Sequence, residues 1–511
     1  MTDSKTNSKR IAKNTIALYL RMFLMMAIGL FTSRVVLQTL GVKDYGTYNV
    51  VGGVVGMFSI VSSSLSTSIS RFITFELGRG NSERLNKVFS TAINVQLLLS
   101  MIVVVLMELV GVWFLNTQMN IPEGRMEVAN WVFQLSIVSF VLGLLTVPYN
   151  ASIIAHEDMG VFAYMSLLDA VFKLLIVYSL YISPFDKLIS YAVLLFGVSL
   201  LMRSIYAIYC KRHYEECTYH FVYDKPLLKE MTGFAGWNFL GDGSWILNNH
   251  GVSILINIFF GVTLNAARGI ASQVDNIVQS FVKNFMTAIN PQITKSYAAG
   301  DIEYMHKLIF AGAKYSAFLM ILFIIPIFLE TDFILHIWLG DMVPDYASIF
   351  IKFTLLSSMC VLLGNTLITS IFATGKIRNY ELVMGLMALS IFPLTWIALK
   401  MGASPVVVYV INFVIYFIMI FVRLFLVKEL IHMSTWKYVK EVLTPVLIVA
   451  FFSIPIPLLI TLLQGDSFSR FLEVLIVSLL CSVFCIYLFG IKQNEKDYLV
   501  RMIRIKILNG K

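Results

Sequence analysis

Long apolar runs separated by short polar segments make up most of the 511-residue chain. A helix needs about 20 mostly apolar residues to cross the hydrocarbon core of a bilayer. Fourteen runs are candidates, and we expect membrane-spanning helices at about 14–37, 46–70, 88–112, 128–150, 160–182, 188–209, 233–258, 264–290, 308–330, 346–373, 379–399, 404–427, 441–463 and 470–490. The pattern predicts an all-α integral membrane protein with 14 transmembrane helices.

The composition agrees with a membrane protein. Hydrophobic residues make up 58% of the chain and charged residues only 14%, whereas soluble domains average about 25% charged residues. Among the five cysteines, Cys481 and Cys485 share a helical face but lack further ligands for a metal ion. We therefore expect packing roles for the cysteines, no metal site and no cofactor.

The distribution of Lys and Arg predicts the orientation, because positively charged loops stay cytoplasmic. With the N-terminus inside, one set of loops and ends holds 25 of the 39 basic residues, the other set holds 5, and 9 fall within spans. We expect both termini in the cytoplasm. The net charge of +9 then reflects topology and contact with membrane lipids, so we expect no nucleic-acid partner.

An internal repeat predicts two lobes. Shifting the chain by 220 residues aligns positions 40–89 with 260–309 without a gap, and ten positions match: Gly41/Gly261, Val42/Val262, Val54/Val274, Thr67/Thr287, Ile69/Ile289, Ile73/Ile293, Thr74/Thr294, Gly80/Gly300, Glu83/Glu303 and Lys87/Lys307. The copies are six spans apart and so run the same way through the membrane, as in transporters built from parallel repeats. We expect two pseudo-symmetric six-helix lobes plus a C-terminal helix pair.

This division predicts the domain boundaries. Residues 1–210 would form the N-terminal lobe, 211–232 a cytoplasmic interlobe linker, 233–430 the C-terminal lobe, 431–490 helices 13 and 14, and 491–511 a basic cytoplasmic tail. The linker is polar and basic, and we expect a short amphipathic surface helix from Pro226 within it.

Polar residues follow one face of the eighth predicted span. At about 100° per residue the stripe contains Arg268, Ser272, Asp275, Gln279, Lys283 and Asn290. A charge at the centre of a bilayer costs roughly 2.5 to 3.5 kcal/mol on insertion scales, so charged residues there usually face a bundle interior or an aqueous cavity. We interpret the stripe as one wall of a central cavity.

Other spans carry candidate cavity residues as well. The seventh aligns Asn238, Asp242, Trp245, Asn249 and Ser253, the second contains Asn49, and the first contains Arg21 and Arg34. In the 220-residue register Arg21 falls one place from Asp242, so we expect the two at similar depth, where they could pair.

Several of these residues also have a structural interpretation. Asn and Ser in the stripes could simply form hydrogen bonds between helices. Asp169 and Lys173 have the spacing of a structural ion pair, and we interpret His156-Glu157-Asp158 as a solvated loop. The sequence does not decide which residues snorkel to the interface and which line the cavity among Lys314, Lys352, Arg203 and Arg423.

Two stretches resemble a known family. The run GFAGWNFLGDGSWILNNHGVSILINIFFGVTLNAARGIASQVDNIVQSFVKNFMTAINPQITKSYAAGD, Gly233–Asp301, resembles the central segment of bacterial polysaccharide-unit flippases. These form the Wzx-type branch of the multidrug/oligosaccharidyl-lipid/polysaccharide (MOP) exporter superfamily. The run TSRVVLQTLGVKDYGTYNVVGG, Thr32–Gly53, resembles their first helix pair. The similarity extends over the whole pattern of spans.

The resemblance implies a MATE-like fold and a transporter rather than an enzyme. Two lobes would move an undecaprenyl-pyrophosphate-linked oligosaccharide from the inner to the outer leaflet of the bacterial cytoplasmic membrane by alternating access. The polymerase and glycosyltransferases of the same pathway would be possible partners. In related lipid II flippases, arginines on helices one, two and eight line the cavity. Arg21 or Arg34 and Arg268 match the first and eighth, whereas the second helix offers only Arg71 at its end.

The charges within the spans favour an anionic cargo. Nine basic residues face three well-buried acids, Asp169, Asp242 and Asp275, and the planar guanidinium of arginine matches phosphate oxygens in two-point contacts. We expect Arg268, Arg21 and Lys283 to attract the pyrophosphate. Asp242 or Asp275 would balance charge or carry a coupling proton or sodium ion.

Two alternatives remain at this stage. A cation-coupled multidrug exporter of the same fold would need an acidic cavity for cationic substrates, which the basic excess disfavours. A membrane glycan polymerase or ligase would need a sizeable extracytoplasmic loop, and the longest predicted ones, near 113–127 and 331–345, are short. The identity of the glycan is not encoded in any of these features.

Overall fold

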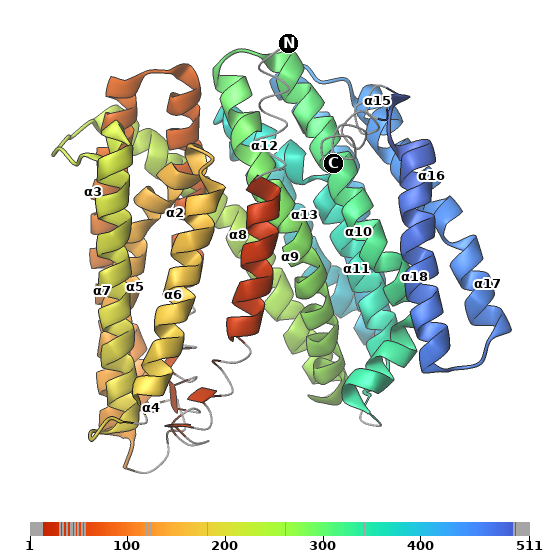
Figure 1. Cartoon of the computed structure of the whole chain (residues 1–511), viewed down its shortest axis with the longest axis horizontal. Coiled ribbons are helices and arrows are strands. Elements are labelled where there is room, and N and C mark those ends of the chain that lie inside the picture. Colours follow the sequence, from red (N-terminus) through yellow and green to blue (C-terminus); the bar gives the residue numbers. More distant parts are fainter. Residues whose placement is uncertain are drawn as a thin grey trace, which may run out of the picture. The chain divides into compact units, whose positions relative to one another are not determined.

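The computed structural model describes residues 14–29, 59–117, 121, 124–180, 182–260, 262–340, 343–493 and 496, together with scattered positions between 32 and 58. The described residues are almost entirely helical (Figure 1). After helix Asn14–Gly29 the helices are α2 (Ser59–Arg79), α3 (Ser82–Leu106), α4 (Val112–Thr117), α5 (Met126–Ala155), α6 (Met159–Ser179), α7 (Lys187–His213), α8 (Lys225–Phe260), α9 (Val262–Ala298), α10 (Ile302–Leu339), α11 (Ala347–Leu363), α12 (Asn365–Thr374), α13 (Arg378–Lys400), α14 (Val406–Ile431), α15 (Thr435–Tyr438), α16 (Thr444–Ser453), α17 (Pro455–Leu463) and α18 (Phe468–Cys485).

Ten helices or helix groups in the described residues are long and apolar enough to cross a membrane. They are 82–117, 126–155, 159–179, 187–213, 302–339, 347–374, 378–400, 406–431, 435–463 and 468–490. The prediction of an all-α, multi-pass membrane protein is confirmed. The count of 14 is not reached, because helix Asn14–Gly29 is shorter and α2, α8 and α9 are not among the ten.

Three of the helices outside the ten carry candidate site residues. Arg21 lies on helix Asn14–Gly29. Asp242 lies on α8, and Arg268, Asp275 and Lys283 lie on α9. Such residues lower the mean hydropathy of a helix, although α8 and α9 have 36 and 37 residues. Their boundaries also differ from the prediction. Helix α2 extends to Arg79, beyond the predicted end at 70, and α8 begins at Lys225, so the surface helix expected from Pro226 is the first part of α8.

The chain divides into two compact units. Unit 1 comprises Met1–Gly243 and Thr294–Asp301, and unit 2 comprises Ser244–Ile293 and Ile302–Lys511. The chain therefore passes from one unit to the other inside α8, again inside α9, and a third time at Asp301–Ile302, where α10 begins. The predicted domain boundaries remain a prediction.

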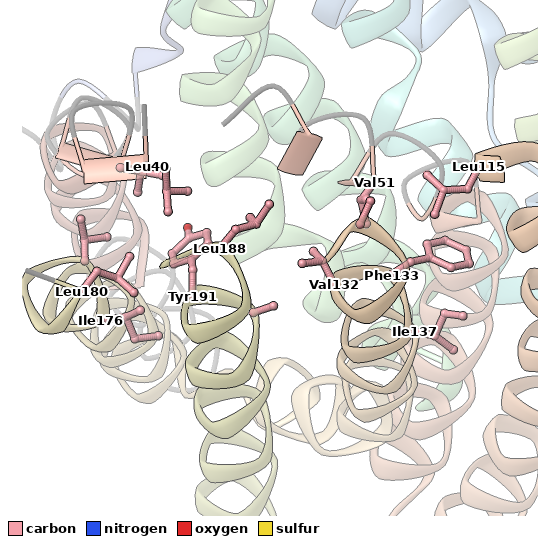
Figure 2. Packing of buried hydrophobic residues seen from close by; sticks show 14 of the residues in the cluster. Leu40, Val51, Leu115, Val132, Phe133, Ile137, Ile176, Leu180, Leu188 and Tyr191 are labelled. Carbon is pink, nitrogen blue, oxygen red and sulfur yellow. The ribbon is translucent and has the colours of Figure 1, made fainter. Parts of the chain in front are cut away.

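Close packing of α5 against α7 lies at the centre of a buried hydrophobic cluster in unit 1 (Figure 2). Val132 and Phe133 of α5 are fully buried, and so is Leu188 of α7. A Cβ at Gly111 of the π-helical turn η1 (Met107–Gly111) would lie 2.7 Å from the Phe133 ring, so glycine is required there. Because lipid tails are as apolar as these side chains, van der Waals packing holds such a core together in a membrane.

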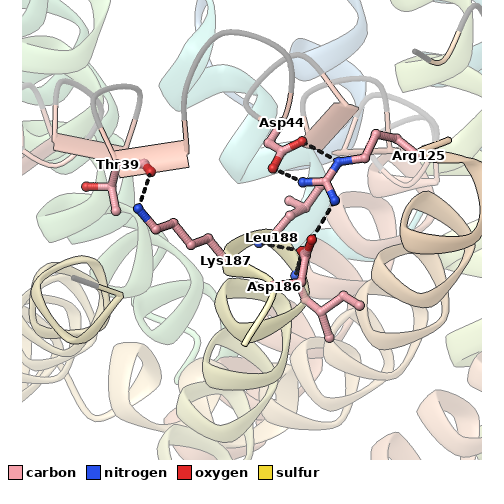
Figure 3. Close-up of polar contacts among 7 residues, drawn as sticks. Thr39, Asp44, Arg125, Asp186, Lys187 and Leu188 are labelled. Atoms are coloured by element: carbon pink, nitrogen blue, oxygen red, sulfur yellow. Dashed lines mark hydrogen bonds and ion pairs between the residues drawn. The ribbon is translucent and has the colours of Figure 1, made fainter. Parts of the chain in front are cut away.

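An ion cluster ties three segments of unit 1 together (Figure 3). Arg125, which precedes α5, donates to both carboxylate oxygens of Asp44 and to Oδ2 of Asp186 at 2.5 Å. Asp186 also accepts the backbone N–H groups of Leu188 and Ile189 and so caps α7. Partial burial opposes ionisation of Asp186, but hydrogen bonds from Arg125 and the backbone outweigh it and lower the pKa of this carboxyl.

The interpretation of residues 156–158 as a solvated loop is wrong. The Glu157 side chain is buried and accepts from Lys295 Nζ at 2.6 Å. His156 Nε2 lies 2.6 Å from Glu216, and the Tyr214 hydroxyl donates to Asp158 at 2.6 Å. This cluster could not be predicted from the sequence, because the partners lie about 60 and 140 residues away, on segments that only the fold brings together.

In unit 2 the tenth predicted span is broken between α11 and α12 at Gly364, whose N–H donates to Val361 at 3.1 Å. Arg423 of α14 is buried against this break, and a Cβ on Gly364 would collide with its guanidinium. Arg423 Nε donates to the Tyr380 hydroxyl at 3.1 Å. Arg423 therefore packs inside unit 2 and does not snorkel, and its positive charge suits the carbonyl end of α11.

Candidate functional site

Four helices of unit 2 surround a polar cavity of about 190 Å³. Both predicted cationic residues of the eighth span, Arg268 and Lys283, line it together with Asp275 and Gln279 of the same stripe. Its described lining is Trp245, Asn248 and Val252 from α8; Arg268, Ser272, Asp275, Asn276, Gln279 and Lys283 from α9; Thr354, Ser357, Ser358 and Val361 from α11; and Tyr409, Asn412 and Tyr416 from α14. Ser272 of the stripe lines the cavity as well. The interpretation of the stripe as one wall of a central cavity between two lobes stays a prediction.

The charged residues of α9 are spread along the cavity wall. Arg268 and Lys283 are 15 positions apart, which corresponds to about 22 Å along a helix. Asp275 lies between them, so two cations flank one carboxylate. The lining has one more positive charge than negative charges, and all its other members are neutral.

Asp275 is the most deeply placed charge in the cavity, with 9% of its surface exposed. Its Oδ2 accepts from Gln279 Nε2 at 2.6 Å, and the same nitrogen donates to Ser358 Oγ of α11 at 3.0 Å. Its Oδ1 is buried without a hydrogen-bond partner among the described residues. A buried carboxylate oxygen of this kind is a suitable acceptor for a proton or a small cation.

Aromatic and amide side chains form the rest of the wall. Arg268 interacts electrostatically with the hydroxyls of Tyr409 and Tyr416 on α14. Tyr416 also interacts with Trp245 and Asn248 of α8. These interactions connect Arg268 with α8 and α14.

The residues contributed by α11 and α14 were not predicted. On α11, Ser357 and Ser358 lie three and four positions after Thr354, and Val361 lies three positions after Ser358. On α14, Tyr409, Asn412 and Tyr416 are spaced three and four apart. This helical periodicity was available in the sequence. What the sequence did not provide was the adjacency of the tenth and twelfth spans to the eighth.

Three other predicted site residues, Arg21, Asn238 and Asp242, do not line this cavity. Asp242 of α8 belongs to unit 1, where its Oδ2 accepts from Ser64 Oγ at 2.8 Å and from Asn238 Nδ2 at 3.4 Å. Arg21 stacks over the Phe162 ring at 4.4 Å and interacts with Tyr206. Arg21 and Asp242, which the sequence suggested could pair, each have other partners in the described structure.

Three further predicted residues cannot be placed. Arg34 and Asn49 lie outside the described residues, and the side chain of Asn249 in α8 is also outside them. The pairing of Asp169 with Lys173 is confirmed, with 2.7 Å between Oδ2 and Nζ. In the described part of the chain, no group of three or more His, Cys, Asp and Glu side chains could hold a metal ion.

Comparison with known proteins identifies the fold. A multidrug resistance MATE family transporter of the MOP superfamily, solved in an outward-facing conformation, superposes with a TM-score of 0.71 over 83% of this chain and 96% of its own, at 12% identity. A MATE structure in the bent conformation gives 0.70 over 84% and 97%, also at 12% identity. A MOP superfamily transporter from Pyrococcus furiosus, described as having a binding pocket of reverse polarity, gives 0.65 at 11% identity and covers 83% and 96%.

Sequence comparison adds a partial relative. The uncharacterized membrane protein EpsK of Bacillus subtilis (strain 168) is 26% identical over 118 residues, which is 23% of this chain and 23% of EpsK. The match thus spans less than a quarter of that relative. No family model matches the sequence. The chain has the fold of the MATE transporters of the MOP superfamily.

Proposed function

We propose that this protein is a flippase that moves undecaprenyl-pyrophosphate-linked oligosaccharide units from the inner to the outer leaflet of the bacterial cytoplasmic membrane, for surface polysaccharide biosynthesis. The observation that carries this proposal is the polar cavity of unit 2, whose lining contains Arg268 and Lys283 against the single acid Asp275. The MATE fold supports a transporter rather than an enzyme.

The cavity chemistry fits an anionic sugar lipid. Charge-assisted hydrogen bonds from arginine to phosphate are among the strongest in proteins, and a low-dielectric site strengthens them further. Asn248, Asn276 and Asn412 offer amide donors and acceptors to sugar hydroxyls, while Trp245 and Tyr409 offer flat apolar faces. In this proposal Arg268 and Lys283 attract the pyrophosphate, and the amides and aromatics contact sugar.

The membrane arrangement is part of the same proposal. Helix Asn14–Gly29, α2, α8 and α9 would cross the membrane with the ten apolar spans, giving 14 helices in two six-helix lobes and a final pair. Both termini would be cytoplasmic, as the loop charges predict. Arg21, Asn238 and Asp242 would then serve the substrate path from unit 1. The glycosyltransferases and polymerase of the pathway would act before and after this step.

Two driving forces are compatible with the cavity. An inside-negative potential favours outward movement of an anionic head group by about 2.3 kcal/mol per charge per 100 mV. Alternatively, the unpaired Oδ1 of Asp275 would carry a proton or a sodium ion in exchange. The second route depends on one carboxylate and is therefore open to direct test.

A multidrug exporter is the second candidate, because one of the solved structures with this fold is a multidrug resistance transporter. The surplus of positive charge in the cavity disfavours cationic drugs. The Pyrococcus furiosus relative, whose reverse pocket polarity is described as suggesting a different function, is a precedent for distinguishing transporters of this fold by pocket charge.

The proposal is tested by reconstituting the protein in vesicles and measuring transfer of a lipid-linked oligosaccharide between leaflets. Hydrogen bonds to charged groups contribute about 1.5–3 kcal/mol, so Arg268→Ala should slow transfer roughly tenfold or more. Arg268→Lys should retain part of the activity. Arg212→Ala, at an exposed position near the end of α7, is the matched control and should behave as wild type.

Wild-type transfer by Arg268→Ala, at an unchanged level of folded protein, would contradict the assignment. Efflux of a cationic dye by the wild type, without transfer of the lipid-linked oligosaccharide, would favour the multidrug exporter.

A further inference from the structure

A second, larger cavity of unit 2 is separate from the polar cavity and shares no lining residue with it. Its volume is about 590 Å³, within the range of small-molecule sites in proteins. It lies among α10, α11, α14, α16 and the π-helical turn η3 (Val439–Leu443). Its walls include Ile325, Phe328, Leu356, Phe417 and Leu447. We call it the apolar groove.

Protein covers the groove only in part. Phe417 of α14 and Leu447 of α16 are 47% and 68% exposed. In a membrane-spanning helix, such exposed apolar side chains contact lipid. Ordinary lipid contact would account for the groove if every wall residue were uncharged.

One wall residue is charged. Lys352 of α11 lines the groove, is partly buried, and has no hydrogen-bond or ion-pair partner among the described residues. A lysine within a membrane span costs roughly 2.5 to 3.5 kcal/mol on insertion scales unless it is paired or hydrated. The groove therefore has an unneutralised cation beside a long apolar wall.

The dimensions fit one lipid chain. Lys352 lies five residues after Ala347, where α11 begins. The groove lining on α11 ends at Leu363, 11 residues after Lys352. The separation of Lys352 and Leu363 along the helix is therefore about 16 Å. The hydrocarbon core is about 30 Å thick, so one leaflet accounts for about 15 Å. A head group near the helix end and one acyl chain along α11 would match this arrangement.

We propose that the apolar groove binds an acidic glycerophospholipid, with the lipid phosphate on Lys352 and one acyl chain along α11, α14 and α16. The phosphate supplies the anion that Lys352 lacks, and the chain covers side chains that protein leaves exposed. This site is independent of the transported substrate and requires only that the protein is embedded in a membrane.

Native mass spectrometry of the detergent-purified full chain tests this inference. The probes are phosphatidylglycerol and phosphatidylcholine with identical acyl chains, added at equal concentration. The wild type should retain phosphatidylglycerol several-fold more than phosphatidylcholine. Lys352→Gln should abolish that preference, and Lys352→Arg should restore it. Lys400→Gln, which removes an exposed lysine at the end of α13, should leave it unchanged.

A second variant tests the apolar part of the site. Ala450 of α16 lines the groove, and Ala450→Trp should reduce retention of both lipids. Unchanged phosphatidylglycerol preference in Lys352→Gln would overturn the proposal. So would selective retention of undecaprenyl phosphate in place of phosphatidylglycerol, because the groove would then serve a polyprenyl chain. Each comparison uses protein that elutes as a single monodisperse species, and Lys352→Gln alone decides the issue if Ala450→Trp does not fold.

Discussion

At the scale of single residues, several buried charges have specific side-chain partners. Asp275 accepts a hydrogen bond from Gln279, and Arg423 donates one to Tyr380. Glu157 accepts from Lys295. Arg268 lies against two tyrosines of α14. The sequence predicted that charges on α9 would share a face, because periodicity fixes direction around a helix axis. It did not reveal their partners, because these come from other helices.

Asp275→Asn tests the role of the unpaired carboxylate oxygen. The amide keeps the size of the side chain and can still accept from Gln279, but it cannot bind a proton or a cation through charge. We expect transport driven by an imposed proton or sodium gradient to fall roughly tenfold or more, while transport driven by membrane potential alone persists. Gradient-driven transport equal to wild type would exclude Asp275 as the ion carrier.

Asp186→Asn tests the ion cluster around Arg125. Asparagine still caps a helix well, so the change isolates the charge. Because the pKa of Asp186 is lowered in the folded protein, its charge stabilises the fold above the carboxyl pKa of the unfolded chain. That contribution is lost as the pH falls through the lower, folded-state pKa. We expect a loss of about 1 kcal/mol or less near neutral pH.

Thermal unfolding in detergent across a pH series would measure this effect. The difference between Asp186→Asn and wild type should shrink in acid. A difference that stays constant with pH would mean that shape or capping, and not charge, is responsible.

At the scale of helices, hydropathy is a poor predictor of the helices that carry the candidate site. Composition identifies the ten apolar spans, whereas α8 and α9 are not among them because their polar stripes lower the mean hydropathy. The broken tenth span and the start of α8 at Lys225 were also missed. Glycine and proline mark positions where a helix could be interrupted. Tertiary packing, such as that of Arg423 on Gly364, determines at which of these positions the helix is interrupted.

Lys295→Ala tests the anchoring of the last turns of α9. Glu157 has 1% of its side chain exposed, so removal of Lys295 takes its cationic partner from a buried carboxylate. Breaking such a pair typically costs about 3–5 kcal/mol, and we expect a clear drop in unfolding temperature.

Lys307→Ala is the matched control for this experiment. Lys307 pairs with Glu303 on the solvent-exposed surface of α10, where ion pairs contribute about 0–1 kcal/mol. Equal destabilisation by the two variants would show that the Glu157 pair has no special role.

At the scale of the whole molecule, the sequence predicted the class of protein and the likeness to the MOP superfamily, and the fold comparisons agree with both. The orientation comes only from the distribution of loop charges. It can be tested with single cysteines at positions 212 and 400 in a chain whose five cysteines are replaced by serine. An impermeant thiol reagent added to intact cells should label position 400 and not position 212. The reverse labelling would invert the topology.

The division of α8 and α9 between the two units has a mechanical consequence. Any movement of one unit against the other must be absorbed where the chain passes between them, which is near Gly243–Ser244 in α8, near Ile293–Thr294 in α9 and at Asp301–Ile302 before α10. Gly241 and Gly243 adjoin the first position, and glycine resists bending least. Pro291 adjoins the second and removes one hydrogen bond from the helix. The bending stiffness of α9 at Pro291 would therefore determine how far Lys295 moves when the polar cavity is displaced.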